Sequence, residues 1–259
     1  MKCAVIGLGE AGSRYAAALA GHGHDVAGVD PSDKPTPPGI RRAGSIAHAV
    51  ADADLVLVAT GAAAAPGIAK TAAPYLLPKA CYADFTSSAP ATMEQLAQIV
   101  EDAGASFADV AILGPVTWHG VQTPLLVSGS GGKAIYELMS AVGANVEVLD
   151  APAGAAMAHK LLRSVFMKGL AAIVGEAVEA SRAAGYEQWA RNQIAAQLAG
   201  DGHAVIDRLL AGTELHAERR RLEMHDTAAY LDSLGVPPLM THATETALQR
   251  IAATPRTSS

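Results

Sequence analysis

The first twenty residues contain a strand, a glycine turn and a helix, and this order constrains the fold more than any other feature. Residues 2–6 are a short apolar run of strand-forming character, and residues 13–20 are rich in alanine, a strong helix former. The turn between them fits the pattern G-x-G-x-x-G. In folds that bind dinucleotides, these glycines permit a tight turn, a close approach of the pyrophosphate and close packing of helix on strand. The residues predicted to bind the dinucleotide phosphates at the helix N-terminus are Gly7, Leu8, Gly9, Glu10, Ala11 and Gly12.

The next predicted strand, residues 24–30, ends in a carboxylate, Asp30. In this fold, an acid at that place accepts hydrogen bonds from the adenosine ribose and repels a 2′-phosphate. We therefore expect NAD rather than NADP. Three basic residues follow closely in the sequence, so NADP remains an alternative: Lys34, Arg41 and Arg42. The alternative is an α/β turn that binds no nucleotide, with Asp30 capping a loop.

A third apolar run, residues 54–60, predicts a buried strand that ends beside a glycine. A nearly continuous apolar run is typical of a parallel strand that is covered on both faces. Because the ends of such strands face the cofactor, Thr60 and Gly61 are candidates for contacts beside the ribose.

Strand and helix patterns alternate as far as residue 150 and then give way to helices alone. Further strands are expected at residues 80–85, 106–113, 123–129 and 145–150, and helices at 154–184, 187–198, 204–210, 214–234 and 238–252. Such alternation predicts an α/β fold of the Rossmann type, a doubly wound, mostly parallel sheet. We therefore expect a dinucleotide-binding domain over residues 1–151 and an all-helical domain over residues 152–259.

The composition argues against several classes of protein. The 259 residues carry a net charge of -6, so the chain lacks the basic surface of proteins that bind nucleic acid or anionic membranes. No uncharged apolar stretch reaches the ~18 residues of a membrane span, and the N-terminal apolar run is too short for a signal peptide. Neither the two cysteines nor the nine histidines have the spacing of metal ligands. We expect a reduced, cytoplasmic setting, a small-molecule substrate and no metal.

Hydroxyl side chains gather after the strand at residues 80–85. The segment Asp84-Phe85-Thr86-Ser87-Ser88-Ala89-Pro90 precedes a predicted helix and lies at the same edge of the sheet as the glycine turn. Thr86 and Ser87 are therefore candidates for polar contacts in a cofactor crevice. The alternative is that Ser87 or Ser88 only caps the helix, a role that needs one hydroxyl.

A lysine interrupts the apolar pattern at the start of the long helix. Lys160 follows Gly154-Ala155-Ala156-Met157-Ala158-His159, and Ser164 lies one turn later on the same face. A buried ammonium loses hydration, which lowers its pKa toward the range in which it exchanges a proton near neutral pH. A reductase needs such a group. The alternative is a surface lysine whose stem packs on the helix while its charge remains in water.

Together, these motifs resemble those of the β-hydroxyacid dehydrogenase family, which includes 3-hydroxyisobutyrate and 6-phosphogluconate dehydrogenases. The family's G-x-G-x-x-G is matched by Gly7, Gly9 and Gly12, its D-x-S-T-x-x-P by residues 84–90, and its G-x-x-x-x-x-K-x-x-x-N helix by Gly154, Lys160 and Ser164. The resemblance extends to about residue 252, and it is greatest to the branch with a compact, phosphogluconate-dehydrogenase-like helical C-terminal domain.

The resemblance implies an NAD(P)-dependent oxidoreductase that transfers a hydride between nicotinamide and a small hydroxy acid or keto compound. By this resemblance, Lys160 is the general acid/base, Thr86 and Ser87 contact substrate or nicotinamide, and Ser164 is a partner of substrate or lysine. The helical domain is then the substrate and dimerisation domain of a homodimer.

Two departures from the family pattern bear on the substrate. The family's D-A-P-V-S-G-G substrate loop aligns with residues 109–115, so its serine becomes Leu113 and its second glycine becomes Pro115. Proline has no N–H to offer a substrate carboxylate. Ser164 replaces the family's asparagine. Two alternatives stay open. One is an imine reductase, since related folds reduce both ketones and imines. The other is a dinucleotide-binding regulatory protein without catalysis, which Leu113 and Pro115 favour and Lys160 opposes.

Overall fold

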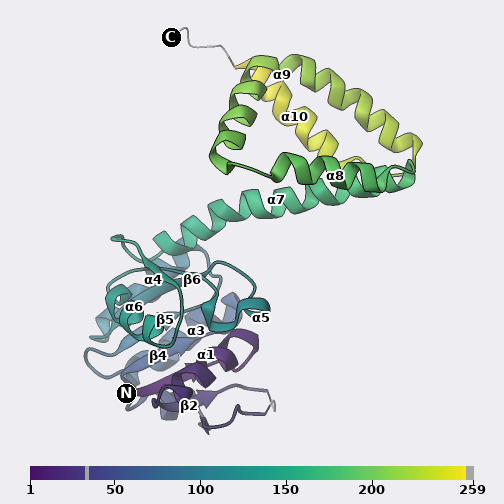
Figure 1. Ribbon diagram of the computed structural model, residues 1–259. Coiled ribbons are helices and arrows are strands. Elements are labelled where there is room, and N and C mark those ends of the chain that lie inside the picture. Colours follow the sequence, from purple (N-terminus) through teal and green to yellow (C-terminus); the bar gives the residue numbers. More distant parts are fainter. Residues whose placement is uncertain (33–34, 255–259) are drawn as a thin grey trace. The chain divides into compact units, whose positions relative to one another are not determined.

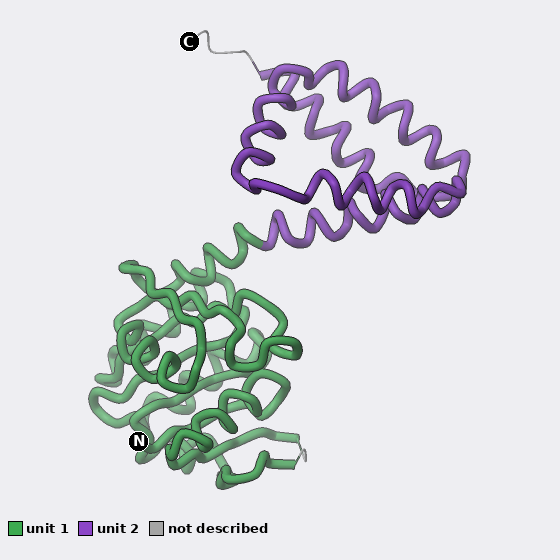
Figure 2. The backbone as a smooth tube through the Cα atoms, viewed as in Figure 1, with its two compact units in different colours: residues 1–163 green, residues 164–259 purple. Residues whose placement is uncertain are grey.

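The computed structural model describes residues 1–32 and 35–254, so Lys34 lies outside the described residues. The chain forms two compact units, residues 1–163 and 164–259 (Figure 2). Helix α7 (Ala155–Ala183) begins in the first unit and continues into the second. The boundary expected from the sequence, between residues 151 and 152, lies just before this helix. The first turns of α7, with Lys160, thus belong to the unit that contains the sheet.

The first unit is built on an eight-stranded sheet with the order β3-β2-β1-β4-β5-β6-β7-β8. Figure 1 labels four of these strands, β2, β4, β5 and β6. The strands are β1 (Lys2–Ile6), β2 (Asp25–Val29), β3 (Arg41–Arg42), β4 (Leu55–Val58), β5 (Cys81–Asp84), β6 (Ser106–Ile112), β7 (Leu125–Ser128) and β8 (Val146–Val148). Neighbouring strands are parallel except β6 and β7, which are antiparallel. The predicted doubly wound, mostly parallel sheet is confirmed.

Helices cover both faces of this sheet, which is why its central strands are apolar on both sides. The helices of the first unit are α1 (Glu10–Gly21), α2 (Ile46–Val50), α3 (Ala65–Ala72), α4 (Pro90–Asp102), α5 (Val116–His119) and α6 (Gly132–Ala141), with single 3₁₀ turns at Ala62–Ala64, Ala73–Tyr75 and Gly120–Gln122. One core contains side chains of α1 and α6, and the other contains side chains of α2, α3, α4 and the first turn of α7. Each central strand therefore contributes alternate residues to two cores.

The second unit consists of helices in its described residues, as predicted. After the remainder of α7 it contains α8 (Glu187–Leu198), α9 (Gly202–Ser233) and α10 (Leu239–Ala253). The sequence predicted two helices within α9, and α9 does consist of two helical stretches, separated by a kink at His216, whose backbone is not helical. None of the helices in the described ranges combines the length and apolar character needed to cross a bilayer.

A carboxylate on α7 holds the first turn of α10. Glu176 accepts hydrogen bonds from the backbone N–H groups of Met240 (2.6 Å) and Thr241 (2.8 Å) and from the Thr241 hydroxyl (2.6 Å). Pro238, the N-cap residue, provides no side-chain cap. Burial opposes ionisation of Glu176, but the hydrogen bonds from Thr241 and Met240 outweigh it and lower the pKa of Glu176. Glu176 thus caps the N-terminus of α10, although it is distant in the sequence.

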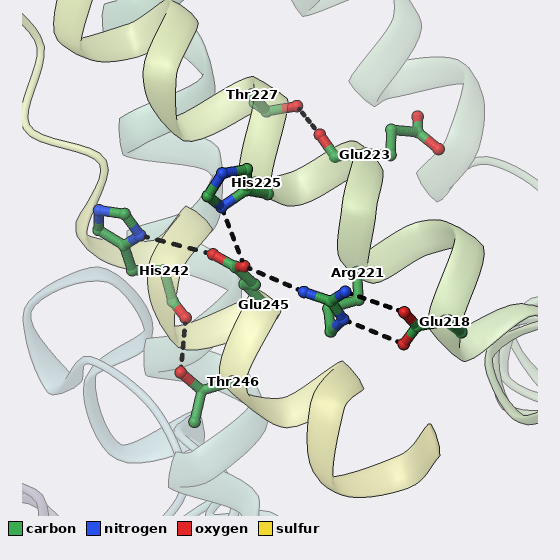
Figure 3. A network of polar contacts seen from close by, with 8 residues as sticks. All are labelled: Glu218, Arg221, Glu223, His225, Thr227, His242, Glu245 and Thr246. Atoms are coloured by element: carbon green, nitrogen blue, oxygen red, sulfur yellow. Dashed lines mark hydrogen bonds and ion pairs between the residues drawn. The ribbon is translucent and has the colours of Figure 1, made fainter. Parts of the chain in front are cut away.

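A polar network joins α9 to α10 on the same unit (Figure 3). Glu245 of α10 lies 3.6 Å from Arg221 and 3.3 Å from His225, both on α9, and 3.8 Å from His242 on its own helix. Arg221 also pairs with Glu218 at 2.9 Å. Because most of these side chains are exposed, we expect each pair to contribute little to stability and the network mainly to fix helix register.

Candidate active site

The glycine turn between β1 and α1 has the geometry that its sequence predicts. Gly7 has φ +94°, which favours glycine, and a Cβ there would lie 2.5 Å from the carbonyl oxygen of Ala59. A Cβ on Gly12 would lie 1.9 Å from the carbonyl oxygen of Gly7. A Cβ on Gly9 would meet no described atom within 4 Å. Gly7 and Gly12 are therefore required for packing, whereas Gly9 leaves open space beside the turn.

The start of α1 fits the phosphates of a dinucleotide. The helix begins at Glu10, and its N-cap residue, Gly9, has no side chain that could cap the N–H groups of the first turn. Helix N-termini attract anions because their N–H groups point outward and the helix dipole is positive there. Open space at Gly9 would let a pyrophosphate reach these groups. The residues present therefore fit a dinucleotide cofactor.

Asp30, directly after β2, is tied to the glycine turn. One carboxylate oxygen accepts the N–H of Leu8 at 2.7 Å, and the other accepts the N–H of Ser32 at 2.8 Å and its hydroxyl at 2.5 Å. Burial opposes ionisation, but the hydrogen bonds from Ser32 and Leu8, with Arg42 nearby, lower the pKa of Asp30. Arg42 donates to the carbonyl oxygens of Asp30 and Ser32, at 2.6 Å each. A fixed anion and a cation thus lie together where an adenosine ribose is expected.

Thr60 and Gly61 follow β4, the strand next to β1 in the sheet. The methyl group of Thr60 would lie 2.7 Å from a Cβ on Gly7, so the two turns are in close contact. Thr60 is partly exposed and Gly61 is exposed. Both residues therefore border the glycine turn at an accessible edge of the sheet, as the order of the strands predicts.

The hydroxyl segment after β5 is brought to Lys160. The Lys160 ammonium donates a hydrogen bond to the Ser87 hydroxyl at 2.9 Å, across 73 residues of sequence. Ser87 is exposed and Lys160 is partly exposed. The structure thus lies between the two alternatives that the sequence left open: the lysine is not buried, but its ammonium is bonded to a distant hydroxyl rather than only to water.

The neighbouring hydroxyls are used within the protein. Thr86 is buried, and its hydroxyl shares a 2.7 Å hydrogen bond with that of Ser88. Helix α4 has Ala89 as its N-cap residue, without a side-chain cap hydrogen bond. The alternative in which Ser87 or Ser88 caps this helix is therefore wrong. Of the predicted pair, Ser87 carries the contact with lysine, whereas Thr86 stabilises the turn beneath it.

Ser164 lies one turn after Lys160, in the second unit. Its hydroxyl accepts a 3.3 Å hydrogen bond from Lys168 on the same helix. Ser164 is thus bonded to a different lysine, and its role as a partner of Lys160 remains a prediction.

Asp109 is a residue whose role the sequence did not reveal. It lies in β6 rather than in a loop, since the strand extends to Ile112, and its side chain is fully buried. One oxygen accepts the N–H groups of Gly154 (3.0 Å) and Met157 (3.1 Å) at the start of α7, and the hydroxyl of Ser128 (3.3 Å). A polar residue inside an apolar strand was the available signal. Asp109 fixes the helix turn that precedes Lys160.

Residues 2–150 match the profile of the NAD binding domain of 6-phosphogluconate dehydrogenase. The chain belongs to this family. Residues 181–251 match a second profile, a domain of unknown function (DUF1932). The resemblance inferred from the motifs is thus confirmed, and with it an NAD(P)-binding domain at the N-terminus.

Solved structures extend this family likeness over the whole chain. A conserved hypothetical protein from Sinorhizobium meliloti is 28% identical, with a TM-score of 0.63 over 100% of this chain and 92% of its own. A conserved protein of unknown function, MTH1747, described as similar to 3-hydroxyacid dehydrogenases, is 24% identical, with a TM-score of 0.65 over 97% and 98%. An imine reductase from Myxococcus stipitatus in complex with NADP+ is 16% identical, with a TM-score of 0.81 over 97% and 94%. At identities below 25%, the last two show the fold alone.

Proposed function

We propose that this NAD(P)-binding family member is an oxidoreductase in which Lys160 is the general acid/base. The observation that carries the proposal is the 2.9 Å hydrogen bond between the Lys160 ammonium and Ser87, at the edge of the sheet where β1, β4 and β5 end. In a doubly wound fold, ligands bind outside the carboxyl ends of the parallel strands. A proton donor at that edge can therefore reach a substrate beside the cofactor.

The residues of the first unit have distinct roles in this proposal. The cofactor supplies the hydride. The ammonium of Lys160 gives a proton to the substrate oxygen during reduction and takes it back during oxidation. Ser87 orients the ammonium and contacts the substrate, and the buried Thr86 supports Ser87. A small hydroxy acid or keto compound is the proposed substrate class.

Reduction of an imine is a second candidate, in which Lys160 would deliver its proton to nitrogen. Leu113 and Pro115 favour it, because they remove a hydroxyl and an N–H that would hold a substrate carboxylate. Similarity to an imine reductase structure shows the fold alone. The test is to measure oxidation of NADH and NADPH with matched panels of keto acids and cyclic imines. Turnover of keto acids alone would exclude the imine reaction, and coenzyme binding without any turnover would favour the regulatory alternative.

We propose NAD as the preferred cofactor, because the Asp30 carboxylate lies fixed beside the glycine turn. Asp30→Asn retains an acceptor for the Leu8 N–H but removes the negative charge. We expect it to raise the affinity for NADPH relative to NADH about tenfold, since relief of one close charge repulsion amounts to roughly 1.4 kcal/mol. Arg42→Gln should move the ratio in the opposite direction. Fluorescence titration with each reduced coenzyme measures both, and an unchanged ratio in Asp30→Asn would contradict the assignment.

We also propose a homodimer formed through α7. In the second unit this helix exposes Val165, Phe166 and Ile173, to 75%, 63% and 48%. Contiguous exposed apolar side chains favour association. Phe166→Glu should shift the protein to a monomer on gel filtration with light scattering. The matched control is Ala171→Glu, at an exposed position of the same helix on the side away from these three residues, which should leave the dimer intact. A wild-type protein that elutes only as a monomer would contradict the proposal.

A further inference from the structure

Two buried aspartates lie side by side beneath the contact between Lys160 and Ser87. Asp84 on β5 and Asp109 on β6 are paired in parallel register, and both are 0% exposed. Paired residues on neighbouring strands project from the same face, with backbones about 4.8 Å apart. Both carboxyl groups therefore share the face of the sheet on which α7 begins.

Each carboxyl group is hydrogen-bonded to the backbone next to one member of the lysine–serine pair. Oδ1 of Asp84 accepts the N–H of Thr86 at 2.8 Å and thereby fixes the turn that carries Ser87. Oδ2 of Asp109 accepts the N–H groups of Gly154 and Met157, in the helix turn directly before Lys160. The distance between Lys160 and Ser87 therefore depends on how these two carboxyl groups lie against each other.

The remaining oxygens of the pair have no partner in the described structure. Oδ2 of Asp84 and Oδ1 of Asp109 are buried and make no hydrogen bond there. Buried polar atoms are normally hydrogen-bonded, and two adjacent carboxylates in a dry core repel each other. A single proton bound between the two carboxyl groups would remove both costs. It would form a hydrogen bond between the two unsatisfied oxygens, and it would neutralise one of the two negative charges.

We propose that Asp84 and Asp109 share one proton between these two oxygens, directly or through one buried water, and that this protonated pair positions Lys160 against Ser87. The proton resides mainly on Asp84, because Asp109 already accepts three donors and lies near the Lys160 ammonium. Burial, with a smaller contribution from Asp109, raises the pKa of Asp84 to about 6. Burial also raises the pKa of Asp109, against the opposing effect of its hydrogen bonds. The catalytic part of this inference rests on the proposed role of Lys160.

Other polar groups surround the two aspartates, and their effects on the titration must be distinguished from that of the pair itself. Tyr82 projects from the same face of β5, with a buried hydroxyl that lacks a partner in the described structure, and burial raises its pKa well above the ordinary value. The Ser128 hydroxyl on β7 donates a hydrogen bond to Asp109, and the positive charge of Lys160 on α7 lowers the pKa of Asp109. Glu94 of α4 lies against Gly154, with an oxygen 3.4 Å from where a Cβ would be. The control for this environment is Tyr82→Phe, which removes the hydroxyl and keeps both carboxyl groups.

The shared proton is tested by carboxyl ¹³C NMR on protein labelled at aspartate, titrated from about pH 4 to about pH 9. We expect two resonances that titrate together, one of them well above the ordinary aspartate range, in wild type and in Tyr82→Phe. Asp84→Asn should abolish the coupled titration and leave a single aspartate, Asp109, that titrates alone. Two aspartates ionised over the whole range in wild type would overturn the proposal, whatever the activity of the enzyme.

The positioning role is tested by stability and by the pH profile. The folded protein retains a proton that the unfolded chain releases near pH 4, so the Tm of wild type should fall as pH rises toward about 6 and then level off. Asp84→Asn should lack this fall, and a descending limb of kcat/KM near pH 6, set by ionisation of the aspartate pair, should move to higher pH. An unmoved limb together with the expected NMR titration would overturn the positioning role alone. Loss of hydride transfer in every variant, wild type included, would instead refute the proposed function.

Discussion

Lys160→Met is expected to lower kcat about 10²- to 10⁴-fold, the range that general acid–base catalysis contributes. Methionine keeps the length and apolar stem of the side chain but has no proton to give. The cofactor site lies on other elements, at the glycine turn and Asp30, so the dissociation constant of the reduced coenzyme should change little. Stopped-flow measurement of hydride transfer, with fluorescence titration of coenzyme, separates the two effects.

The control for this variant is Lys133→Met, which removes an exposed lysine of the same unit that pairs only weakly with Glu137, at 3.9 Å. It should retain wild-type turnover. If Lys160→Met bound coenzyme and kept more than about a tenth of wild-type kcat, the lysine would not be the proton donor. Ser87→Ala should have a smaller effect, because it removes the group that orients the ammonium but leaves the ammonium itself.

Gly12→Ala should damage both folding and cofactor binding. Its Cβ would lie 1.9 Å from the carbonyl oxygen of Gly7, so α1 must move away from β1. Overpacking of this kind costs about 1–3 kcal/mol, and here it also displaces the N–H groups that would hold the phosphates. Chemical denaturation should show the loss of stability, and coenzyme titration the loss of affinity.

Gly9→Ala is the matched control for Gly12→Ala. A Cβ on Gly9 meets nothing within 4 Å, and the backbone there is in the extended region that alanine adopts freely. We expect wild-type stability and weaker coenzyme binding, because the methyl group would occupy the space beside the phosphates. Equal destabilisation by both substitutions would contradict this division between a packing glycine and a binding glycine.

The sequence predicted most of the fold because its local signals agree. The apolar runs of β1 and β4 predict buried parallel strands, the glycine turn marks the start of α1, and Asp30 marks the end of β2. What it missed depends on the path of the chain. The reversed direction of β7 follows from the connection through α5 and cannot be read from its apolar pattern. The break in α9 at His216 separates two helical stretches, as the sequence predicted, but lies a few residues later than expected.

The candidate site was predicted in its members and less well in its interactions. Lys160 and Ser87 were both singled out, but their contact joins positions 73 residues apart, which spacing cannot indicate. Thr86 was expected to face a ligand, whereas its hydroxyl is bonded to Ser88. The role of Asp109 depends on backbone N–H groups of α7. Nearly every residue has such a group, so the sequence does not indicate which of them will bond to Asp109. Partners of this kind become visible only when the strands and helices are assembled.

The bond between Glu176 and the first turn of α10 has a consequence for shortened versions of the chain. If the protein ended before residue 239, the partly exposed Glu176 would lose these donors and be hydrated by water instead. Its pKa should then rise toward the ordinary value of a glutamate. The titration of this one carboxyl group therefore reports whether the last helix is docked, and carboxyl ¹³C NMR on truncated and full-length protein would show the difference.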